Sequence, residues 1–123
     1  MKPLKLSSLP KTWIFDLDGT IVKHNCHLED KDKLLPGVKK FLSKISKKDF
    51  IIILTARSKK FRKQTEEFLK KKKIRYDLII FDVPLGERIL INDKKPSGLK
   101  TAYAINVNRD EGLQVDFVIQ KQK

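Results

Sequence analysis

The sequence has 123 residues, and its 28 lysine and arginine residues outnumber its 15 acidic residues to give a formal net charge of +13. This length suits one compact domain rather than two. No apolar run approaches the roughly 20 residues that a membrane-spanning helix needs, which argues against a membrane protein. The single cysteine excludes an intramolecular disulfide framework, and a cytoplasmic location is the simplest expectation.

The positive charge would raise the local concentration of anions such as phosphate esters and nucleic acid. Only five of the basic residues are arginines, however, and arginine is the commoner choice for recognising phosphates and bases. A lysine-rich composition can also reflect genome base composition. We find no run of basic residues interleaved with aromatic residues that would support base stacking.

The first half of the chain predicts two strands and a helix between them. Residues 1–10 lack a sustained apolar core, so we expect a loose N-terminal arm, not a signal peptide, followed by one domain over residues 11–123. Residues 11–16 form the first predicted strand. After a polar stretch, Pro36 and Gly37 open a helix whose apolar residues recur at helical spacing as far as residue 45. Residues 50–54 form an apolar strand covered on both faces.

The second half continues the alternation of helices and strands. A helix is predicted over residues 59–72, with lysines at its end where they favour the helix dipole. Strands follow over residues 78–83 and 89–91, and the tail contains strand-like segments at 102–107 and 115–119. This alternation predicts an α/β fold with a parallel sheet.

Two carboxylates, Asp16 and Asp18, close the first predicted strand. Residues two apart in a strand point to the same side, so both can face one spot at the carboxyl end, where open α/β sheets bind ligands. Such a pair favours a hard cation such as Mg²⁺. Gly19 permits a sharp turn and Thr20 adds a hydroxyl group. A solvated or calcium-binding turn is the alternative reading of this stretch.

Residues 16–20 resemble the first motif of the haloacid dehalogenase (HAD) superfamily of phosphohydrolases. The resemblance implies that Asp16 attacks phosphorus and carries an aspartyl-phosphate, while Asp18 acts as general acid and base. It also implies a three-layer, Rossmann-like parallel sheet with helices on both faces. The spacing between motifs leaves no room for a cap domain. Capless members admit large substrates or borrow a cap from another subunit, so a homo-oligomer is possible.

Two later segments resemble further motifs of the same family. Residues 53–57 resemble the second motif, which implies that Thr55 binds the transferring phosphoryl group, helped by the amides of Ala56 and Arg57 at a helix N-terminus. Residues 89–93 resemble the fourth motif, which implies that Asp93 completes the Mg²⁺ shell. The other metal ligands would be the carboxylate of Asp16 and the main-chain carbonyl of Asp18.

The cation that the third family motif supplies is not fixed by the sequence. Lys73 has about the expected spacing but lies in a lysine run at a helix end. Arg88 lies just before the fourth predicted strand, close to the expected edge of the site, and we favour it. Lys94 and Lys95 are also expected near the site, where Lys94 could contact substrate.

The loop after the first motif contains His24, Asn25 and His27. One cysteine and two histidines without regular ligand spacing argue against zinc. We expect this loop to be a flap over the site, with His24 or Asn25 touching substrate, and an ordinary surface loop is the alternative. Whether tail residues such as Tyr103 and Arg109 line a pocket or an interface stays open.

These features favour a Mg²⁺-dependent phosphatase of a small phosphorylated metabolite, such as a sugar phosphate. The pattern also resembles small bacterial HAD proteins associated with capsule or surface-polysaccharide synthesis. Two alternatives remain: a nucleic-acid end phosphatase, which the charge and the open site favour, and a non-catalytic basic module that binds nucleic acid on the same fold. Steep weakening by salt would mark binding to a phosphate backbone.

Overall fold

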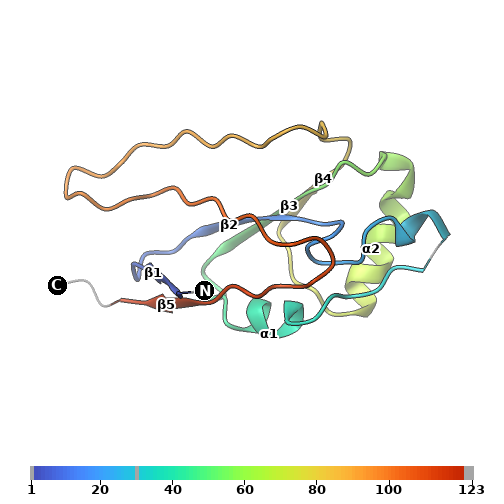
Figure 1. Ribbon diagram of the computed structural model, residues 1–123, viewed down its shortest axis with the longest axis horizontal. Coiled ribbons are helices and arrows are strands. Elements are labelled where there is room, and N and C mark those ends of the chain that lie inside the picture. Colours follow the sequence, from blue (N-terminus) through green and yellow to red (C-terminus); the bar gives the residue numbers. More distant parts are fainter. Residues whose placement is uncertain (1, 30, 121–123) are drawn as a thin grey trace.

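A three-stranded parallel sheet forms the centre of the computed structural model, which describes residues 2–29 and 31–120 (Figure 1). The strands are β2 (Thr12–Asp16), β3 (Phe50–Leu54) and β4 (Leu78–Ile80), in the order β2-β3-β4. The register places Asp16 beside Leu54, so the ends of β2 and β3 are level at one edge of the sheet. Functional groups that follow these two strands are therefore neighbours.

The helices cover the face of the sheet that carries Trp13 and Phe15. Helix α1 (Val38–Ser43) connects β2 to β3, and Phe41 in α1 makes edge-on contacts with both aromatic rings of β2. Helix α2 (Arg62–Lys71), preceded by the 3-10 turn η2 (Lys59–Phe61), connects β3 to β4. Alternate residues of the strands point to the opposite face, where Ile14 stays 50% exposed and Ile80 42% exposed.

The two ends of the chain pair with each other rather than remaining loose. Strand β1 (Leu4–Leu6) runs parallel to β5 (Phe117–Ile119), with Leu4 opposite Phe117. Leu6 is buried, and the ring of Phe117 packs against Trp13 at 4.9 Å between ring centroids. The prediction of a loose arm over residues 1–10 is therefore wrong for β1, because its leucines complete the core beside α1.

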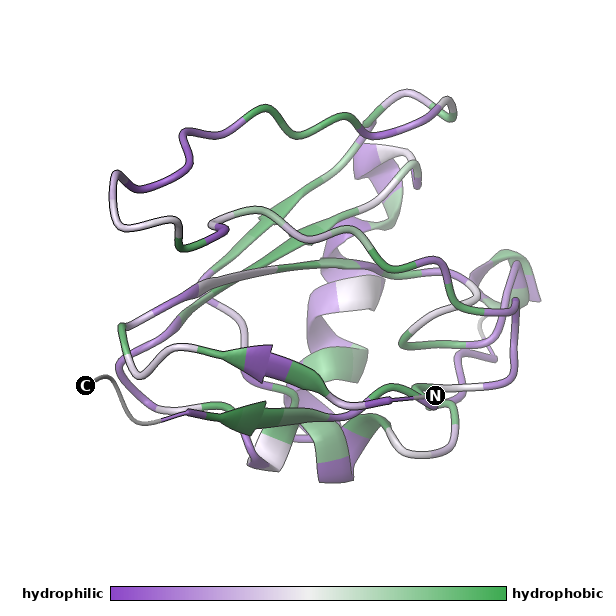
Figure 2. Cartoon of the chain, turned by 60° about the vertical axis from the view of Figure 1, so that its left-hand side comes forward, coloured by the Kyte–Doolittle hydropathy of each residue, from purple (hydrophilic) through white to green (hydrophobic). Residues whose placement is uncertain are grey.

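Residues 84–107, all of them described, contain no helix or strand. The predicted strands over residues 89–91 and 102–107 are absent, and β4 ends at Ile80 instead of residue 83. Asp82 adopts a left-handed backbone (φ 60), which takes the chain out of the sheet before Pro84. Apolar residues in this extended segment stay in solvent, as the hydropathy colours show (Figure 2), and Ile91 is 91% exposed.

The prediction of an α/β fold with a parallel, Rossmann-like sheet is confirmed, and the described residues show no cap domain. The prediction placed helices on both faces of the sheet, whereas α1 and α2 both lie on the face that carries Trp13 and Phe15. Among the described residues between the first motif and α1, the one helical element is the 3-10 turn η1 (Cys26–Glu29). Within residues 2–29 and 31–120, no helix has both the length and the apolar character needed to cross a bilayer.

Candidate functional site

An open cavity of about 360 Å³ lies at the carboxyl ends of β2 and β3. Seven of the residues that the sequence singled out line it: Asp16, Asp18, His24, Asn25, Ala56, Arg57 and Arg88. Ser58, His27 and Arg109 also contribute to its wall. The structure therefore brings together residues from the first motif, the second motif, the loop after the first motif and the segment after β4.

The backbone after β2 explains how both aspartates reach this cavity. Gly19 has φ 84, and its amide donates to the carbonyl of Val22, which closes a tight turn directly after Asp18. The side chain of Asp16 is 40% exposed and that of Asp18 17% exposed. Thr20 donates a long hydrogen bond of 3.5 Å to Asp16. Gly19 and Thr20 thus shape the turn that holds the two carboxylates.

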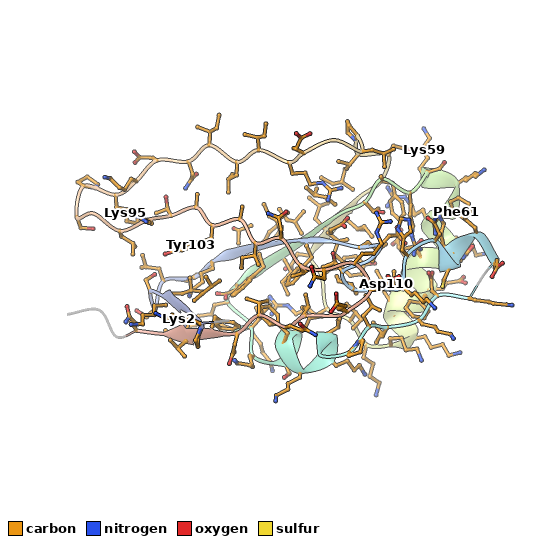
Figure 3. All side chains as sticks on the ribbon, in the orientation of Figure 1. Lys2, Lys59, Phe61, Lys95, Tyr103 and Asp110 are labelled. Carbon is orange, nitrogen blue, oxygen red and sulfur yellow. The ribbon has the colours of Figure 1, made fainter. Side chains whose placement is uncertain are left out.

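Arg88 is the cation that reaches Asp16. Its Nη1 atom lies 3.1 Å from Oδ1 of Asp16, as we expected for the third-motif position. Lys73, Lys94 and Lys95 are not among the described residues that line the cavity. Figure 3 shows Lys95 at the opposite end of the molecule from Phe61, so the turn that contains Lys94 and Lys95 lies far from the site.

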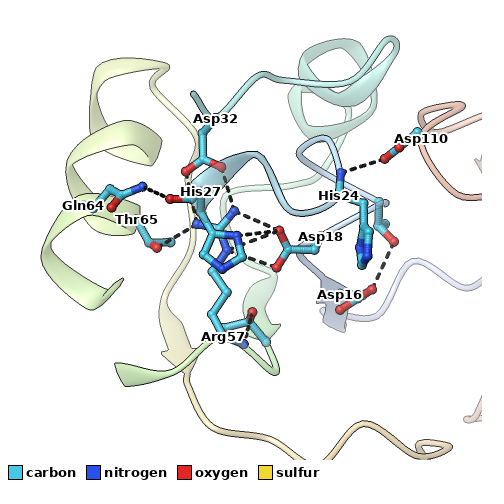
Figure 4. Close-up of polar contacts among 11 residues, drawn as sticks. Asp16, Asp18, His24, His27, Asp32, Arg57, Gln64, Thr65 and Asp110 are labelled. Carbon is cyan, nitrogen blue, oxygen red and sulfur yellow. Dashed lines mark hydrogen bonds and ion pairs between the residues drawn. The ribbon is translucent and has the colours of Figure 1, made fainter. Parts of the chain in front are cut away.

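The side chain of Arg57 is held in buried ion pairs, whereas the predicted phosphate contact was through its main-chain amide. Its side chain is 1% exposed and lies between the carboxylates of Asp18 and Asp32 (Figure 4). Two hydrogen bonds go to Asp18, from Nε at 3.0 Å and from Nη2 at 2.9 Å. Two more go to Asp32, from Nη2 at 2.7 Å and from Nη1 at 3.1 Å. The Nη1 atom also donates to the hydroxyl of Thr65 at 2.8 Å. A guanidinium has five N–H donors, and here all five have protein acceptors.

The consequence is that the side chain of Arg57 orients Asp18. Burial opposes the charge of Arg57, but hydrogen bonds to Asp18 and Asp32 outweigh burial, and the pKa of the guanidinium is raised. Asp32 and Thr65 were not predicted from the sequence. Asp32 lies in a polar loop and Thr65 in the middle of α2, and neither position belongs to a motif that would reveal the contact.

Thr55, the residue predicted to bind the phosphoryl group, is fully buried and is not among the described residues that line the cavity. Its hydroxyl accepts a hydrogen bond from the amide of Arg57 at 3.1 Å, and its own amide donates to the carbonyl of Ile80. These contacts fix the turn that follows β3. Ala56 and Arg57, whose amides were predicted to bind the phosphate, both line the cavity.

His27 is a further wall residue, and its environment is unusual. Its side chain is 8% exposed, and its Nδ1 atom has no hydrogen-bond partner among the described residues. This atom lies 3.7 Å from Oδ1 of Asp18, and the ring packs edge-on against Phe61. Burial, followed by the charge of Arg57, lowers the pKa of His27. The imidazole is therefore held neutral beside the carboxylate of Asp18 at neutral pH.

The tail of the chain also reaches the site. The carboxylate of Asp110 accepts a hydrogen bond from the amide of His24 at 2.8 Å, and the amide of Asp110 donates to the carbonyl of Gly19 at 2.9 Å. Arg109 lines the cavity, and its side chain packs 3.2 Å from where a Cβ of Gly19 would lie. The question left open for Arg109 is thus answered in favour of the pocket. The expected flap borders the cavity through His24 and Asn25.

The predicted metal ligands do not all come together. Asp93 lies in the exposed turn of residues 84–107, where its carbonyl accepts a hydrogen bond from Thr101, and it is not among the described residues that line the cavity. Its displacement follows from the missing strand over residues 89–91, which would have carried it to the sheet edge. No cluster of three or more histidine, cysteine or acidic residues suited to a metal occurs in the described ranges. Of the two carboxylates among the described residues that line the cavity, only that of Asp16 is outside a buried ion pair.

Comparison with known proteins gives a partial match. No protein-family model and no curated protein matches the chain. Two solved chains do, from structures titled "Structure of Pnkp1/Rnl/Hen1 complex" and "Structure of the Pnkp1/Rnl/Hen1 RNA repair complex". Each is 34% identical, with TM-scores of 0.53 and 0.52 over 67% and 66% of this chain. The match spans 31% and 28% of those chains, so this chain is similar to less than a third of either. Neither title bears on the predicted association with polysaccharide synthesis.

Proposed function

We propose that this chain is a phosphomonoesterase of the capless HAD type that removes a terminal phosphate from a nucleic acid. One observation carries the chemical part of the proposal. Asp16, which is open to the cavity and paired with Arg88 at 3.1 Å, lies two residues before Asp18 at the carboxyl end of a parallel strand. A carboxylate nucleophile, a second carboxylate and a cation for phosphate charge are the groups that such a reaction needs.

The proposed reaction has two displacements at phosphorus. The carboxylate of Asp16 attacks, an O–P bond to Asp16 forms, and the bond between phosphorus and the leaving oxygen breaks. Asp18 gives a proton to that oxygen and then takes one from a water molecule. The water attacks the aspartyl-phosphate, so that inorganic phosphate leaves and the carboxylate of Asp16 is restored. Arg57 holds Asp18 in position for both proton transfers.

Mg²⁺ is part of the proposal. Magnesium sites commonly combine one or two carboxylates with phosphate oxygens and water. Asp16 would provide the carboxylate and the main-chain carbonyl of Asp18 a second ligand, as the family resemblance implies. When bound, the ion would neutralise negative charge on the transferred phosphoryl group. The residues that line the cavity fit this pair of ligands from Asp16 and Asp18. They do not fit the set of three ligands that includes Asp93.

The nature of the substrate rests on different support. The formal charge of +13, the open cavity and the likeness to chains from an RNA repair complex together favour a nucleic acid. A small phosphorylated metabolite such as a sugar phosphate is the second candidate, because the cavity of about 360 Å³ is large enough for one.

The first experiment measures hydrolysis of an aryl phosphate, with and without Mg²⁺, by the parent, by Asp16→Asn and by Asp116→Asn. Asp116 is an exposed residue whose carboxylate pairs with Lys44 away from the cavity, so it controls for the loss of one surface carboxylate. We expect turnover that needs both Mg²⁺ and Asp16 and that survives in Asp116→Asn. Equal turnover by the parent and Asp16→Asn would refute the assignment of the nucleophile.

The second experiment compares kcat/KM for oligonucleotides with a 3′- or 5′-terminal phosphate against a panel of sugar phosphates. We expect the oligonucleotides to be better substrates, and their advantage should shrink as the salt concentration rises. A sugar phosphate that is turned over faster at every salt concentration would establish the second candidate instead.

A further inference from the structure

A second hollow, of about 630 Å³, lies along the outer side of α2. Four lysines line it, together with Glu67 and Phe68: Lys60, Lys63, Lys71 and Lys72. Residues 63, 67 and 71 follow each other at intervals of four, so they share one face of the helix and extend over about 12 Å. We call this surface, defined by the four lysines and Phe68, the α2 groove.

The segment that carries the α2 groove holds nearly half of the net positive charge of the chain. Residues 59–73 contain eight basic and two acidic residues, a net charge of +6 within a chain whose net charge is +13. Glu66 is paired with Arg62 at 3.2 Å. Asp32, which also borders the groove, is bound by the guanidinium of Arg57. Glu67 is thus the one acidic residue lining the groove that is not already held by an arginine among the described residues.

The α2 groove adjoins the cavity that contains Asp16. Asp32 lines the groove and binds the guanidinium of Arg57, and Arg57 is one of the residues that line the cavity. Gln64 also lines the groove and donates to the main-chain carbonyl of His27, a wall residue of the cavity, at 2.9 Å. Figure 4 shows these residues side by side. A strand that leaves the cavity past this wall would enter the α2 groove.

Two of the groove lysines lie beside aromatic rings, of which that of Phe68 lines the groove. The ammonium group of Lys60 lies 5.2 Å from the ring centroid of Phe61, and that of Lys72 lies 5.9 Å from the centroid of Phe68. Sites for single-stranded nucleic acid combine positive charge that follows the backbone with aromatic rings. The side chains that make this combination are spread over η2 and α2, and the fold gathers them on one side.

We propose that the α2 groove binds the phosphate backbone of a single-stranded nucleic acid whose terminal phosphate lies in the cavity at Asp16. The inference deepens the proposed function and rests on it for the identity of the reacting end. In this proposal the lysines contact the phosphates and not the base edges, so the affinity is independent of sequence.

The test measures the salt dependence of binding by fluorescence anisotropy in the Asp16→Asn background, which prevents turnover. The probe is a labelled single-stranded RNA of about 12 nucleotides with a terminal phosphate, and DNA of the same sequence is a second probe. The groove variant replaces Lys60, Lys63, Lys71 and Lys72 by glutamine. The matched control replaces four other exposed lysines by glutamine and has the same net charge: Lys39, Lys40, Lys47 and Lys48.

If the four groove lysines each neutralise one phosphate, the slope of log K against log salt should fall by about 3 in the groove variant. When salt rises from 50 to 200 mM, the affinity of the parent should therefore fall about 50-fold more than the affinity of the groove variant. The control variant should keep the parental slope. Circular dichroism should show folded protein in both variants, because glutamine and lysine have similar helix propensities.

Three outcomes would overturn the inference: no binding of either probe by the Asp16→Asn protein, an unchanged slope in the groove variant, or an equal fall in the control. The last would mean that net charge alone attracts the strand. These outcomes are independent of the aryl phosphate assay. Turnover that needs Asp16, together with an unchanged slope, would refute the groove and leave the proposed function standing.

Discussion

Replacing Arg57 by methionine tests the buried ion pairs between the cavity and α2. The change removes the guanidinium and leaves two carboxylates, one on Asp18 and one on Asp32, without their partner. The side chain of Asp32 is only 3% exposed. Removing one partner of a buried ion pair costs about 3–5 kcal/mol, because the remaining charge is poorly solvated. The structure therefore predicts a large loss of stability from one substitution.

The entropy of unfolding converts this loss of free energy into a decrease in melting temperature. For a chain of this length, 1 kcal/mol corresponds to about 4 °C, so Arg57→Met should lower Tm by about 12–20 °C. The matched control is Arg62→Met, which removes an exposed arginine whose partner Glu66 lies one helical turn away. Such exposed pairs contribute about 0.3–0.5 kcal/mol, so the control should lose about 1–2 °C.

A second variant separates lost charge compensation from lost packing. The combination of Arg57→Met with Asp18→Asn and Asp32→Asn removes both stranded charges and should recover much of the lost stability. Calorimetry or thermal circular dichroism at neutral pH and constant salt measures all of these proteins. An Arg57→Met protein that melts within about 2 °C of the parent would show that the guanidinium does not compensate buried charge. A triple variant no more stable than Arg57→Met would assign the loss to packing.

Three more predictions follow from other contacts. Burial and the charge of Arg57 lower the pKa of His27 in the folded state, so the unfolded chain takes up a proton first as the pH falls below about 6.5. The contribution of neutral His27 to the free energy of unfolding is therefore complete above about pH 6.5 and declines below it. Chemical denaturation should show a weaker decline in His27→Gln than in the parent. Gly112→Ala should lower the unfolding free energy by about 2 kcal/mol or more, since Gly112 has φ +83 and a Cβ there would overlap the carbonyl oxygen of Pro36. Arg88→Ala should lower kcat/KM for an aryl phosphate by about 10²-fold, and Arg88→Lys by less, because lysine keeps the charge without the planar fork.

Each of these predictions has a contrary result. A parallel decline of stability with pH in the parent and in His27→Gln would assign that decline to other groups. A Gly112→Ala protein as stable as the parent would show that the turn at Gly112 moves away from Pro36 at little cost. Unchanged kinetics in Arg88→Ala would remove the guanidinium from the reaction.

The sequence predicted the elements whose patterns are local. The apolar run of β3 and the helical spacing before Leu69 in α2 depend on neighbours a few residues away. Strand β3 has its expected bounds, and α2 begins three residues later than predicted because residues 59–61 form η2. The convergence of Asp16 and Ala56 also followed from a general rule, because the ends of parallel strands meet at one edge. Arg88 was favoured for its place just before a predicted strand over residues 89–91, and it lies beside Asp16 although that strand is absent.

What the sequence could not predict depends on long-range geometry. Ile91 belongs to an apolar run with strand propensity, but the left-handed turn at Asp82 directs the chain away from the sheet, and Asp93 goes with it. The pairing of Leu6 with Ile119 joins segments that carry no mutual signal. The ion pairs of Arg57 depend on where Asp32 falls in a loop, which no periodic pattern encodes.

The pairing of β1 with β5 has a consequence for how the protein folds and unfolds. Leu4 lies opposite Phe117, so this contact closes a loop that contains almost the whole chain. Closing a loop of roughly 110 residues costs about 4 kcal/mol in chain entropy, beyond a constant that all loops share. The β2-β3-β4 sheet needs much shorter closures and should form first. The terminal strands would then dock last, so their leucines would slow the unfolding rate and leave the folding rate almost unaffected.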